Sequence, residues 1–191
     1  MPTKIVFEKE AVARAAYNVI ERDGIGALNA RSVAKELGCS TQPIYLRYPD
    51  MGCLKNDADK LIRATYTEYL ERGLTEKGGT AVEGGLYMGY LTAYVKFAAE
   101  KPNLFAYLFM RYRGEETAED ENLRLAIVGG ISKAGGYSTE VAEKFFISSW
   151  LFAHGIACQI ATGFIKWSGE KVETMLSENF RALKKFYGDK I

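Results

Sequence analysis

The side chains best suited to binding chemistry lie in one short stretch of the 191-residue chain, residues 41–47. Thr41, Gln42, Tyr45 and Arg47 carry hydrogen-bond donors and acceptors of the kinds that match phosphate oxygens and the edges of bases. An ordinary helix that faces water carries more Glu and Lys at such positions. These residue types therefore indicate a surface that contacts nucleic acid.

Catalytic and metal-binding chemistry has little support in the sequence. The single histidine, His154, rules out a site with several imidazole ligands, and Cys39, Cys53 and Cys158 lack the paired spacing of a zinc site. We interpret the cysteines as buried, reduced thiols, with redox sensing at Cys39 or Cys158 as the alternative. Because a phosphate-binding glycine motif and a paired acidic signature are also missing, we expect no enzyme activity, no metal and no cofactor.

Composition and charge describe a globular protein. Hydrophobic residues make up 48% of the chain, 25 Lys and Arg are nearly balanced by 24 Asp and Glu, and the net charge is +1. These values exclude a disordered tail and a polycation that coats nucleic acid by charge alone, so nucleic-acid binding must use a local surface. No window approaches 18 uninterrupted apolar residues, and residues 1–9 carry charges where a signal peptide would be apolar. We therefore predict a cytoplasmic protein that is not inserted in a membrane.

The elements that must position the polar residues are helices. Apolar side chains recur at spacings of three and four and not in strict alternation, which predicts an all-α fold of about nine helices. The first helix is expected from about Lys9 to Asp23, where Asp23-Gly24 gives a helix-ending signal. A fourth helix is expected to be capped by Asp50 and to continue until Gly73.

Between these longer helices the sequence predicts two short ones. Asn29 is a good N-cap for the second helix, which ends before Gly38, the residue best suited to a left-handed C-cap. Ser40 is expected to cap the third helix, residues 41–48, which tolerates Pro43 in its first turn. Two short helices joined by a tight glycine turn form a helix-turn-helix unit, whose second helix can enter a major groove.

Burial and charge within this unit can be read from the same residues. Ile44 is expected to point inward together with Val33, Ala34 and Leu37. Residues 28–48 contain three cationic residues and one carboxylate, a modest basic patch that suits few phosphate contacts per subunit. An arbitrary helical bundle would show the same caps and apolar stripes. The interpretation as a DNA-binding helix-turn-helix therefore depends on the residue types of the third helix.

The stretch from Gly24 to Tyr48 resembles the DNA-binding signature of TetR-type transcriptional regulators. The frame consists of a glycine, a capped second helix with Val33-Ala34, a Leu-Gly-x-Ser turn, Ile44-Tyr45, and an aromatic residue three positions after that tyrosine. The resemblance covers the first third of the chain. It implies an amino-terminal helix-turn-helix domain, a double-stranded DNA operator as partner, and a larger carboxy-terminal domain for ligand binding and dimerisation.

The resemblance also implies which residues meet the operator. Side chains of the third helix touch the DNA, whereas Asn29, Arg31 and Tyr48 lie near the DNA backbone or support that helix. Family members commonly carry a lysine at the start of the fourth helix, where Met51 stands here, so Lys55 one turn later is the candidate for that phosphate contact. The residues expected at the DNA are Asn29, Arg31, Ser40, Thr41, Gln42, Pro43, Tyr45, Arg47, Tyr48 and Lys55.

The remainder of the chain is expected to form a second helical domain. Residues 73–85 contain five glycines and a charged Glu-Lys pair, a composition typical of a joint between domains. We therefore assign residues 1–50 to the helix-turn-helix domain, residues 51–75 to a connecting fourth helix and residues 76–191 to the effector-binding and dimerisation domain. The further helices are expected from about Leu86 to before Pro102, and over residues 103–111, 122–133, 138–162 and 170–187, with an exposed charged loop at 113–121.

The last two helices are amphipathic and apolar over more than one side, which predicts a homodimer made by pairing helices 138–162 and 170–187 of two subunits. The Trp150 to Gly155 segment resembles the W-x-x-x-H-G segment of many TetR-type regulatory domains, and Tyr94 to Pro102 resembles the end of their fifth helix.

We predict a pocket for an apolar or aromatic small-molecule effector, which releases a repressor from a palindromic operator. Plain core packing is the alternative for the aromatic residues expected to line this pocket. The candidate pocket residues are Tyr87, Tyr90, Tyr94, Phe105, Phe109, Phe146, Trp150 and His154. The competing function is a helical protein–protein adaptor without DNA binding.

Overall fold

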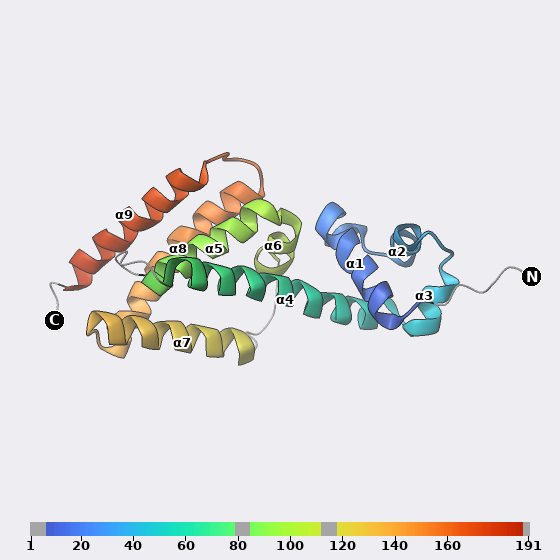
Figure 1. Ribbon diagram of the computed structural model, residues 1–191, viewed down its shortest axis with the longest axis horizontal. Coiled ribbons are helices and arrows are strands. Elements are labelled where there is room, and N and C mark those ends of the chain that lie inside the picture. Colours follow the sequence, from blue (N-terminus) through green and yellow to red (C-terminus); the bar gives the residue numbers. More distant parts are fainter. Residues whose placement is uncertain (1–6, 79–84, 112–117, 189–191) are drawn as a thin grey trace, which may run out of the picture. The chain divides into compact units, whose positions relative to one another are not determined.

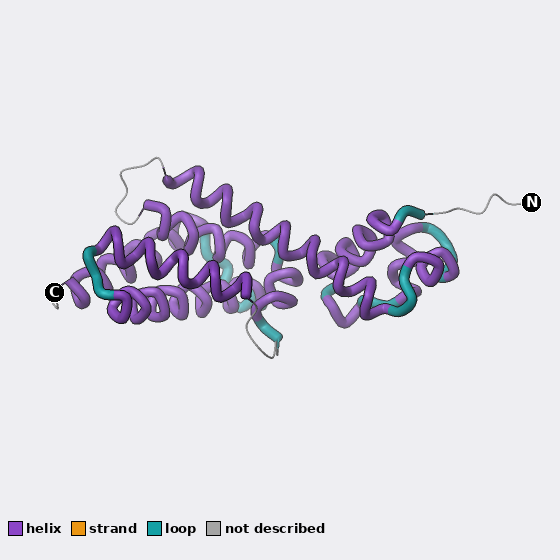
Figure 2. The backbone as a smooth tube through the Cα atoms, turned by 90° about the horizontal axis from the view of Figure 1, so that it is seen from below, coloured by secondary structure: helices purple, strands orange, loops and turns teal. Residues whose placement is uncertain are grey.

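The computed structural model describes residues 7–78, 85–111 and 118–188. Over these residues the chain forms nine α-helices and one short 3₁₀ helix, and no strand is present in them (Figures 1 and 2). The expected all-α fold of about nine helices is therefore confirmed. In chain order the helices are α1 (Lys9–Asp23), η1 (Ile25–Ala27), α2 (Ala30–Leu37), α3 (Gln42–Arg47), α4 (Met51–Gly78), α5 (Gly85–Glu100), α6 (Pro102–Phe109), α7 (Ala118–Gly135), α8 (Thr139–Ala161) and α9 (Gly169–Gly188).

The helices group into two compact units. The first unit contains the described residues up to Glu68 together with Lys101–Met110, and the second contains Tyr69–Glu100 and the described residues after Met110. α4 begins in the first unit and ends in the second, and α6 belongs to the first unit although it follows α5 in sequence. The domain boundaries expected at residues 50 and 75 remain a prediction about separable functions.

The first unit is built around α1. Val12, Ala16, Val19 and Ile20 are fully buried along one face of this helix, and α1 packs against α2, α3 and α6. The spacing of these apolar residues follows the helical period, so that a single stripe supplies the centre of the core. The remaining core residues of the unit include Val33, Ile44, Tyr48, Leu54, Ala58, Ile62, Leu104 and Phe105.

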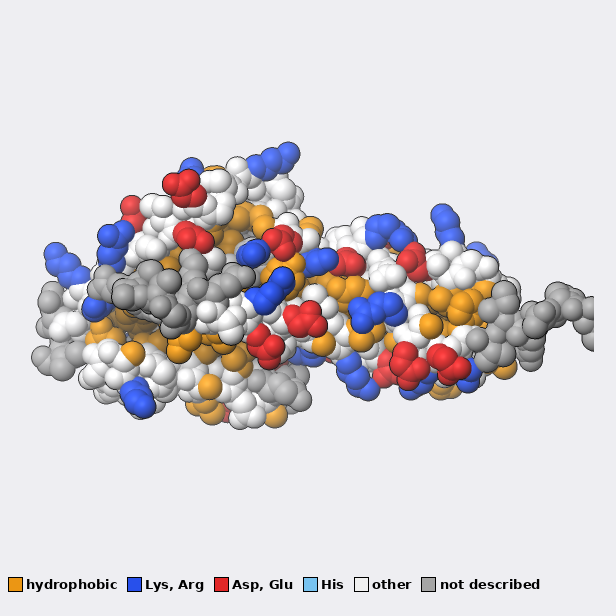
Figure 3. Space-filling view, in the orientation of Figure 1, with side chains coloured by type: hydrophobic (Ala, Val, Ile, Leu, Met, Phe, Trp, Pro, Cys, Tyr) orange, Lys and Arg blue, Asp and Glu red, His pale blue; other side chains and the backbone are white. Residues whose placement is uncertain are grey.

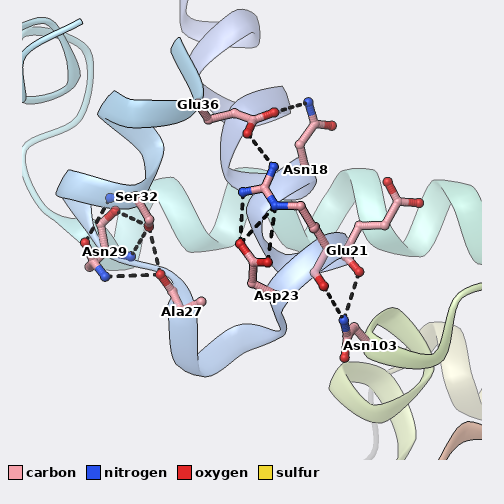
Figure 4. Close-up of polar contacts among 9 residues, drawn as sticks. Asn18, Glu21, Asp23, Ala27, Asn29, Ser32, Glu36 and Asn103 are labelled. Carbon is pink, nitrogen blue, oxygen red and sulfur yellow. Dashed lines mark hydrogen bonds and ion pairs between the residues drawn. The ribbon is translucent and has the colours of Figure 1, made fainter. Parts of the chain in front are cut away.

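α6 is joined to the carboxyl end of α1 by polar contacts as well as by packing. The Asn103 side-chain amide donates hydrogen bonds of 3.0 Å to the backbone carbonyls of Glu21 and Arg22 (Figure 4). The Lys101 ammonium lies 2.5 Å from a carboxylate oxygen of Glu21. The last carbonyls of a helix have no partner within the helix, so Asn103 supplies donors that α1 itself lacks.

The second unit packs α5, α7 and α9 around α8, and α9 also contacts α5. Its core is aromatic: Phe145 of α8 lies edge-on to Phe180 of α9 at a ring separation of 5.4 Å and also packs against Tyr137. Phe97, Tyr94 and Phe145 are almost completely buried. None of the helices described in either unit has the length and apolar character needed to span a membrane.

Some helix ends differ from the sequence-based expectation. Ser40 does not cap α3, because the residue before the helix is Thr41, whose side chain makes no capping hydrogen bond. Gly73 does not end α4, which continues to Gly78. A side-chain carbon at Gly73 would lie 2.6 Å from the backbone oxygen of Gly89, so this glycine allows close approach of α4 and α5 and is not a helix stop.

The loop expected over residues 113–121 is also partly wrong. Residues 118–121 form the first turn of α7, while residues 113–117 lie outside the described part of the chain. α7 extends to Gly135 and includes Gly129 and Gly130, because the cost of glycine in a helix is small compared with that of breaking the helix. The charged composition indicates exposure, which an outward-facing first turn satisfies as well as a loop does.

Candidate nucleic-acid interface

The start of α2 is fixed by a reciprocal cap. The Asn29 side-chain oxygen accepts hydrogen bonds of 3.0 Å from the backbone N–H groups of Arg31 and Ser32, and the Ser32 hydroxyl accepts one from the Asn29 N–H. The Asn29 amide and the Ser32 hydroxyl both donate to the carbonyl of Ala27 (Figure 4). This network confirms Asn29 as the N-cap and holds α2 in place for the turn that follows.

Gly38 makes the turn between α2 and α3. Its φ of 66° and ψ of 33° place it in the left-handed region, and its N–H and that of Cys39 donate to carbonyls of the last turn of α2. Glycine adopts this conformation at little cost, which explains why it ends the helix here. α2, the Gly38 turn and α3 thus form the expected helix-turn-helix.

α3 is held from behind by Ile44 and Tyr48, which are only 1% and 2% exposed. The Tyr48 hydroxyl lies between two acceptors, the Lys9 carbonyl at 3.2 Å and the Asp57 carboxylate at 3.1 Å, and burial raises the pKa of this phenol. Hydrogen bonds, first from Lys60 and then from Lys9, keep the pKa of Asp57 below its usual range, so the acceptor stays ionised. Of the two roles expected for Tyr48, the burial favours support of α3.

The opposite side of α3 is open. Gln42 is exposed, and Tyr45 and Leu46 keep 55% and 57% of their surface exposed. An open hollow of about 460 Å³ lies between the start of α2 and α3 and is lined by Asn29, Ala30, Arg31, Thr41 and Tyr45. Exposed polar and aromatic groups therefore line this hollow together with the cationic Arg31, an arrangement that suits a phosphate and its attached base.

Leu46 was not among the residues predicted from the sequence. It lies two positions after the buried Ile44, which in an α-helix is a rotation of about 200° and therefore the opposite side. Its apolar type argued for the core, whereas its register argues for exposure. An exposed aliphatic side chain beside Gln42 and Tyr45 can contact the methyl group of thymine.

Arg47 does not extend freely from α3. Its guanidinium donates a 2.6 Å hydrogen bond to the backbone carbonyl of Phe7 and lies 3.9 Å from a Glu8 carboxylate oxygen. It therefore ties the end of α3 to the residues before α1. Of the other predicted residues, Ser40 is exposed, whereas Pro43 and Lys55 are half-buried.

The charge distribution around α2 leaves its cations exposed. Glu36, the one carboxylate within residues 28–48, is turned towards α1, where it accepts hydrogen bonds from Arg22 at 2.7 Å and Asn18 at 3.1 Å. The Arg22 guanidinium, followed by Asn18, lowers the pKa of Glu36. Arg31 and Lys35 remain exposed. Elsewhere the charged side chains of both signs are interspersed, as the face in Figure 3 shows.

The residues predicted to bind an effector fall into two groups. Phe105 and Phe109 are on α6 in the first unit, where Phe109 lies edge-on to Tyr66 at 5.1 Å. The others are on α5 and α8 in the second unit, where Tyr90 packs between Tyr87 and Tyr94. The second group, which we call the aromatic cluster, consists of Tyr87, Tyr90, Tyr94, Phe146, Trp150 and His154.

Two polar contacts lie within the aromatic cluster. The Tyr87 hydroxyl lies 2.5 Å from the buried Ser149 hydroxyl, and the Tyr94 hydroxyl lies 2.8 Å from Nδ1 of His154. The His154 ring stacks on Trp150 at 5.0 Å, and burial lowers its pKa, so the imidazole is neutral at pH 7. Tyr90, Tyr94 and Phe146 are buried in the core of the second unit, so the polar atoms of this cluster are paired within an aromatic core.

The cysteines differ from one another in exposure. Cys39 and Cys158 are half-buried, and burial raises the pKa of both thiols, which disfavours the reactive thiolate. Cys53 is exposed, so the expectation that all three are buried is wrong for this residue. It lies in the first turn of α4, where its N–H donates a 2.8 Å hydrogen bond to Asp50 and confirms Asp50 as the cap.

These observations define an all-helical protein with an exposed helix-turn-helix. Comparison with known proteins supports this fold. No family model and no curated protein matches the chain. It resembles the structure of a protein of unknown function from Rhodococcus sp. RHA1, with a TM-score of 0.69 and 22% identity over 94% of this chain and 95% of that one. It also resembles a protein from Pseudomonas aeruginosa PAO1 described as a "putative transcriptional regulator", with a TM-score of 0.67 and 18% identity over 93% and 90% of the two chains. At these identities the likeness concerns the fold.

Proposed function

We propose that the protein is a TetR-type transcriptional regulator that binds double-stranded DNA with α3. The observation that carries this proposal is the orientation of α3, whose apolar residue Ile44 is buried while Gln42, Tyr45 and Leu46 face outward. A short helix seated in this way presents its polar face to a major groove. The likeness of the fold to a protein described as a transcriptional regulator supports the same function.

Each part of the surface has a role in the proposed complex. Gln42 reads a base edge, with adenine as its best partner, and Tyr45 and Thr41 bind sugar or phosphate. A phosphate occupies the hollow beside the start of α2, where the exposed guanidinium of Arg31 favours an anion. Asn29, Tyr48 and Arg47 act mainly by holding α2 and α3 in position.

The proposed active form is a homodimer. One short helix reads only a few base pairs, so two copies of α3 spaced about 34 Å apart are needed to read a palindrome. Ile147 and Leu151 lie one turn apart on α8 and are 45% and 55% exposed, and Phe186 on α9 is 55% exposed. An apolar face of this kind on α8 and α9 supports pairing of these two helices with their copies.

We propose that an apolar or aromatic effector binds at the aromatic cluster and lowers the affinity for DNA. α5, which carries half of the cluster, leads directly into α6, and α6 is bonded to the end of α1 through Asn103 and Lys101. The covalent chain thereby connects the ligand site with the helix on which α2 and α3 pack. A coupling free energy of about 1–3 kcal/mol is typical of such regulation, and repression relieved by the ligand follows as the working mechanism.

A gel shift with the DNA that flanks its own gene tests the DNA contact. Gln42→Ala is expected to relax sequence discrimination by about 1–3 kcal/mol, because a paired adenine edge loses its partner. Tyr45→Ala is expected to weaken binding to every sequence alike. Leu125→Ala and Asn122→Ala on α7, where both side chains are exposed, are the matched controls and should bind as the wild type does.

Both α3 variants leave the buried side of the helix intact, so circular dichroism should show unchanged helix content. Retention of the wild-type shift by both variants would remove α3 from the interface. Failure of the wild-type protein to shift any fragment selected from genomic DNA would favour the adaptor function instead. In that case the same exposed face of α3 would be tested as a protein-binding surface.

A further inference from the structure

Three exposed side chains of α3 decide which bases this helix can select. Leu46 follows Gln42 by four positions, so the two side chains lie on one face of the helix, one turn apart. Tyr45, three positions after Gln42, lies on the same face. We call these three residues the reading face. It consists of an amide, a phenol and an aliphatic group, and it carries no charge.

Arg47, the one cation in the sequence of α3, lies outside the reading face. It is rotated about the helix axis by about 140° from Gln42 and by about 100° from Leu46. Its Nε donates a 2.6 Å hydrogen bond to the Phe7 carbonyl, and a terminal nitrogen lies 3.9 Å from a Glu8 carboxylate oxygen. Both its register and its partners therefore hold this guanidinium beside the residues that precede α1.

A reading face without a cation is poorly suited to guanine. The commonest specific contact to guanine is a bidentate bond from arginine or lysine to O6 and N7, which are both acceptors. The exposed cations Arg31 and Lys35 belong to α2, and the first helix of a helix-turn-helix crosses the DNA backbone, where cations meet phosphates. A G·C pair beneath α3 would therefore lack its best partner.

The groups that are present match the two bases of an A·T pair. The Gln42 amide offers a donor and an acceptor, which complement N7 and N6 of adenine. Leu46 is 57% exposed, and its methyl groups can contact the C5-methyl group of thymine, the one methyl group that the four bases display in the major groove. This contact removes an aliphatic side chain from water and therefore favours binding.

The separation of Gln42 and Leu46 limits the separation of their targets. Four residues of an α-helix rise about 6 Å along its axis, and successive base pairs are about 3.4 Å apart. We propose that α3 selects A·T pairs, with Leu46 contacting a thymine methyl group within about two base-pair steps of the adenine that Gln42 binds. This inference rests on the proposed function, and it specifies the class of operator that the protein prefers.

The test uses the full chain and the tightest-binding fragment selected from genomic DNA, shortened to the segment that the protein protects from nuclease digestion. Duplexes with deoxyuridine in place of one thymidine at a time lose a methyl group and keep the base pairing. At one or two positions in each half-site this replacement should weaken wild-type binding about fourfold, the effect of one methyl group in an apolar contact. Replacement of a nearby adenine by 7-deazaadenine should weaken it about fivefold, because the N7 acceptor is lost.

Leu46→Ala assigns the methyl contact to this residue. The variant should bind the unmodified operator more weakly than the wild type does, and deoxyuridine at the sensitive positions should have no further effect, because the methyl group has already lost its partner. Leu125→Ala on α7, at a side chain with a similar exposed fraction of 52%, is the matched control and should respond to deoxyuridine as the wild type does. Circular dichroism should show the same helix content in both variants.

Gln42→Arg tests the consequence of adding a cation to the reading face. The new guanidinium should change the preference at the position of the bound adenine from A·T to G·C, by about tenfold in the ratio of the two affinities. The ratio is the informative quantity, because an added positive charge strengthens binding to every DNA. An unchanged preference for A·T would show that Gln42 does not read this base and would overturn its assignment.

The outcomes distinguish this inference from the proposed function. Wild-type binding that is indifferent to deoxyuridine at every position would overturn the inference and leave DNA binding intact. Equal sensitivity of Leu46→Ala and the wild type to deoxyuridine would do the same. Failure of the wild type to bind any selected fragment would contradict the proposed function itself, and the inference with it.

Discussion

Asn29 uses both ends of its side-chain amide to hold the start of α2. The oxygen accepts from two backbone N–H groups and the nitrogen donates to the Ala27 carbonyl. These are the groups that a helix cannot satisfy internally at its first turn. Although Asn29 lines the hollow beside α3, its main contribution is therefore to the stability of the helix-turn-helix.

Replacement of Asn29 separates that contribution from DNA binding. Asn29→Ala is expected to lower the free energy of unfolding of the first unit by about 0.5–2 kcal/mol, because the cap is lost. Asn29→Asp keeps the acceptor and should retain most of the stability, but its charge should weaken the affinity for DNA phosphates. Urea unfolding followed by circular dichroism measures the first effect and a gel shift the second. Equal stability of the Ala and Asp variants would contradict the capping role.

At this scale the sequence predicted local roles well. Asn29, Gly38, Asp50 and the inward position of Ile44 follow from rules that involve only a few neighbouring residues. The reach of Arg47 back to Phe7 joins residues 40 positions apart in the chain, so no local rule predicts it. Whether any of the candidate residues contacts DNA or an effector stays a prediction.

Among the helices, α4 and α7 show that a glycine inside a helix can have two different structural environments. Gly73 lies in the interior of α4 at its closest approach to α5, whereas Gly129 in α7 has no heavy atom within 4 Å of the position that a Cβ would take. Composition alone treats both as weak points of a helix. The structure distinguishes them by what surrounds each one.

Alanine at these two glycines is expected to act in opposite directions. Gly73→Ala should destabilise the second unit by about 1–3 kcal/mol, because the new carbon overlaps Ala93 and the Gly89 carbonyl and the helices must separate. Gly129→Ala should stabilise it by about 0.5–1 kcal/mol, because alanine loses less entropy in a helix. Thermal unfolding of both variants measures the difference. A stabilising effect of Gly73→Ala would show that α4 and α5 do not approach closely there.

The extents of the helices could be predicted only where an end signal was local. α1, α2, α8 and α9 begin and end within a residue or so of the expected positions, since their caps and breakers are adjacent in sequence. α4 and α7 run beyond their expected ends, because packing overrides the weak helix propensity of glycine. The early part of α7 was mistaken for a loop for the related reason that charge indicates exposure but not backbone conformation.

For the whole molecule, the apolar face of α8 leads to a test of the proposed homodimer. Leu151→Glu places a charge on that face and is expected to give monomers and to weaken operator binding by about 10²-fold, because two linked half-site contacts become one. Leu125→Glu on α7, at a side chain with a similar exposed fraction of 52%, is the control and should remain dimeric. Sedimentation measures the oligomeric state. A Leu151→Glu protein that stays dimeric with unchanged helix content would rule out pairing through this face.

The all-helical architecture follows from the period of the apolar residues, but the grouping of α6 with α1 could not be predicted in this way. It depends on contacts between residues about 80 positions apart, such as Asn103 with Glu21 and Arg22. Periodicity tells which face of a helix is buried and not against which partner.

The insertion of α6 into the first unit has a consequence for the order in which the protein forms on the ribosome. The first four helices emerge early, but the carbonyls at the end of α1 and the apolar surface that Leu104 and Phe105 cover stay incomplete until residues 101–110 have been translated. The nascent amino-terminal segment must therefore wait while residues 69–100 are synthesised. Its final closure requires residues 101–110 but not residues 111–191, so the first unit can be completed while the larger part of the second unit has yet to be translated.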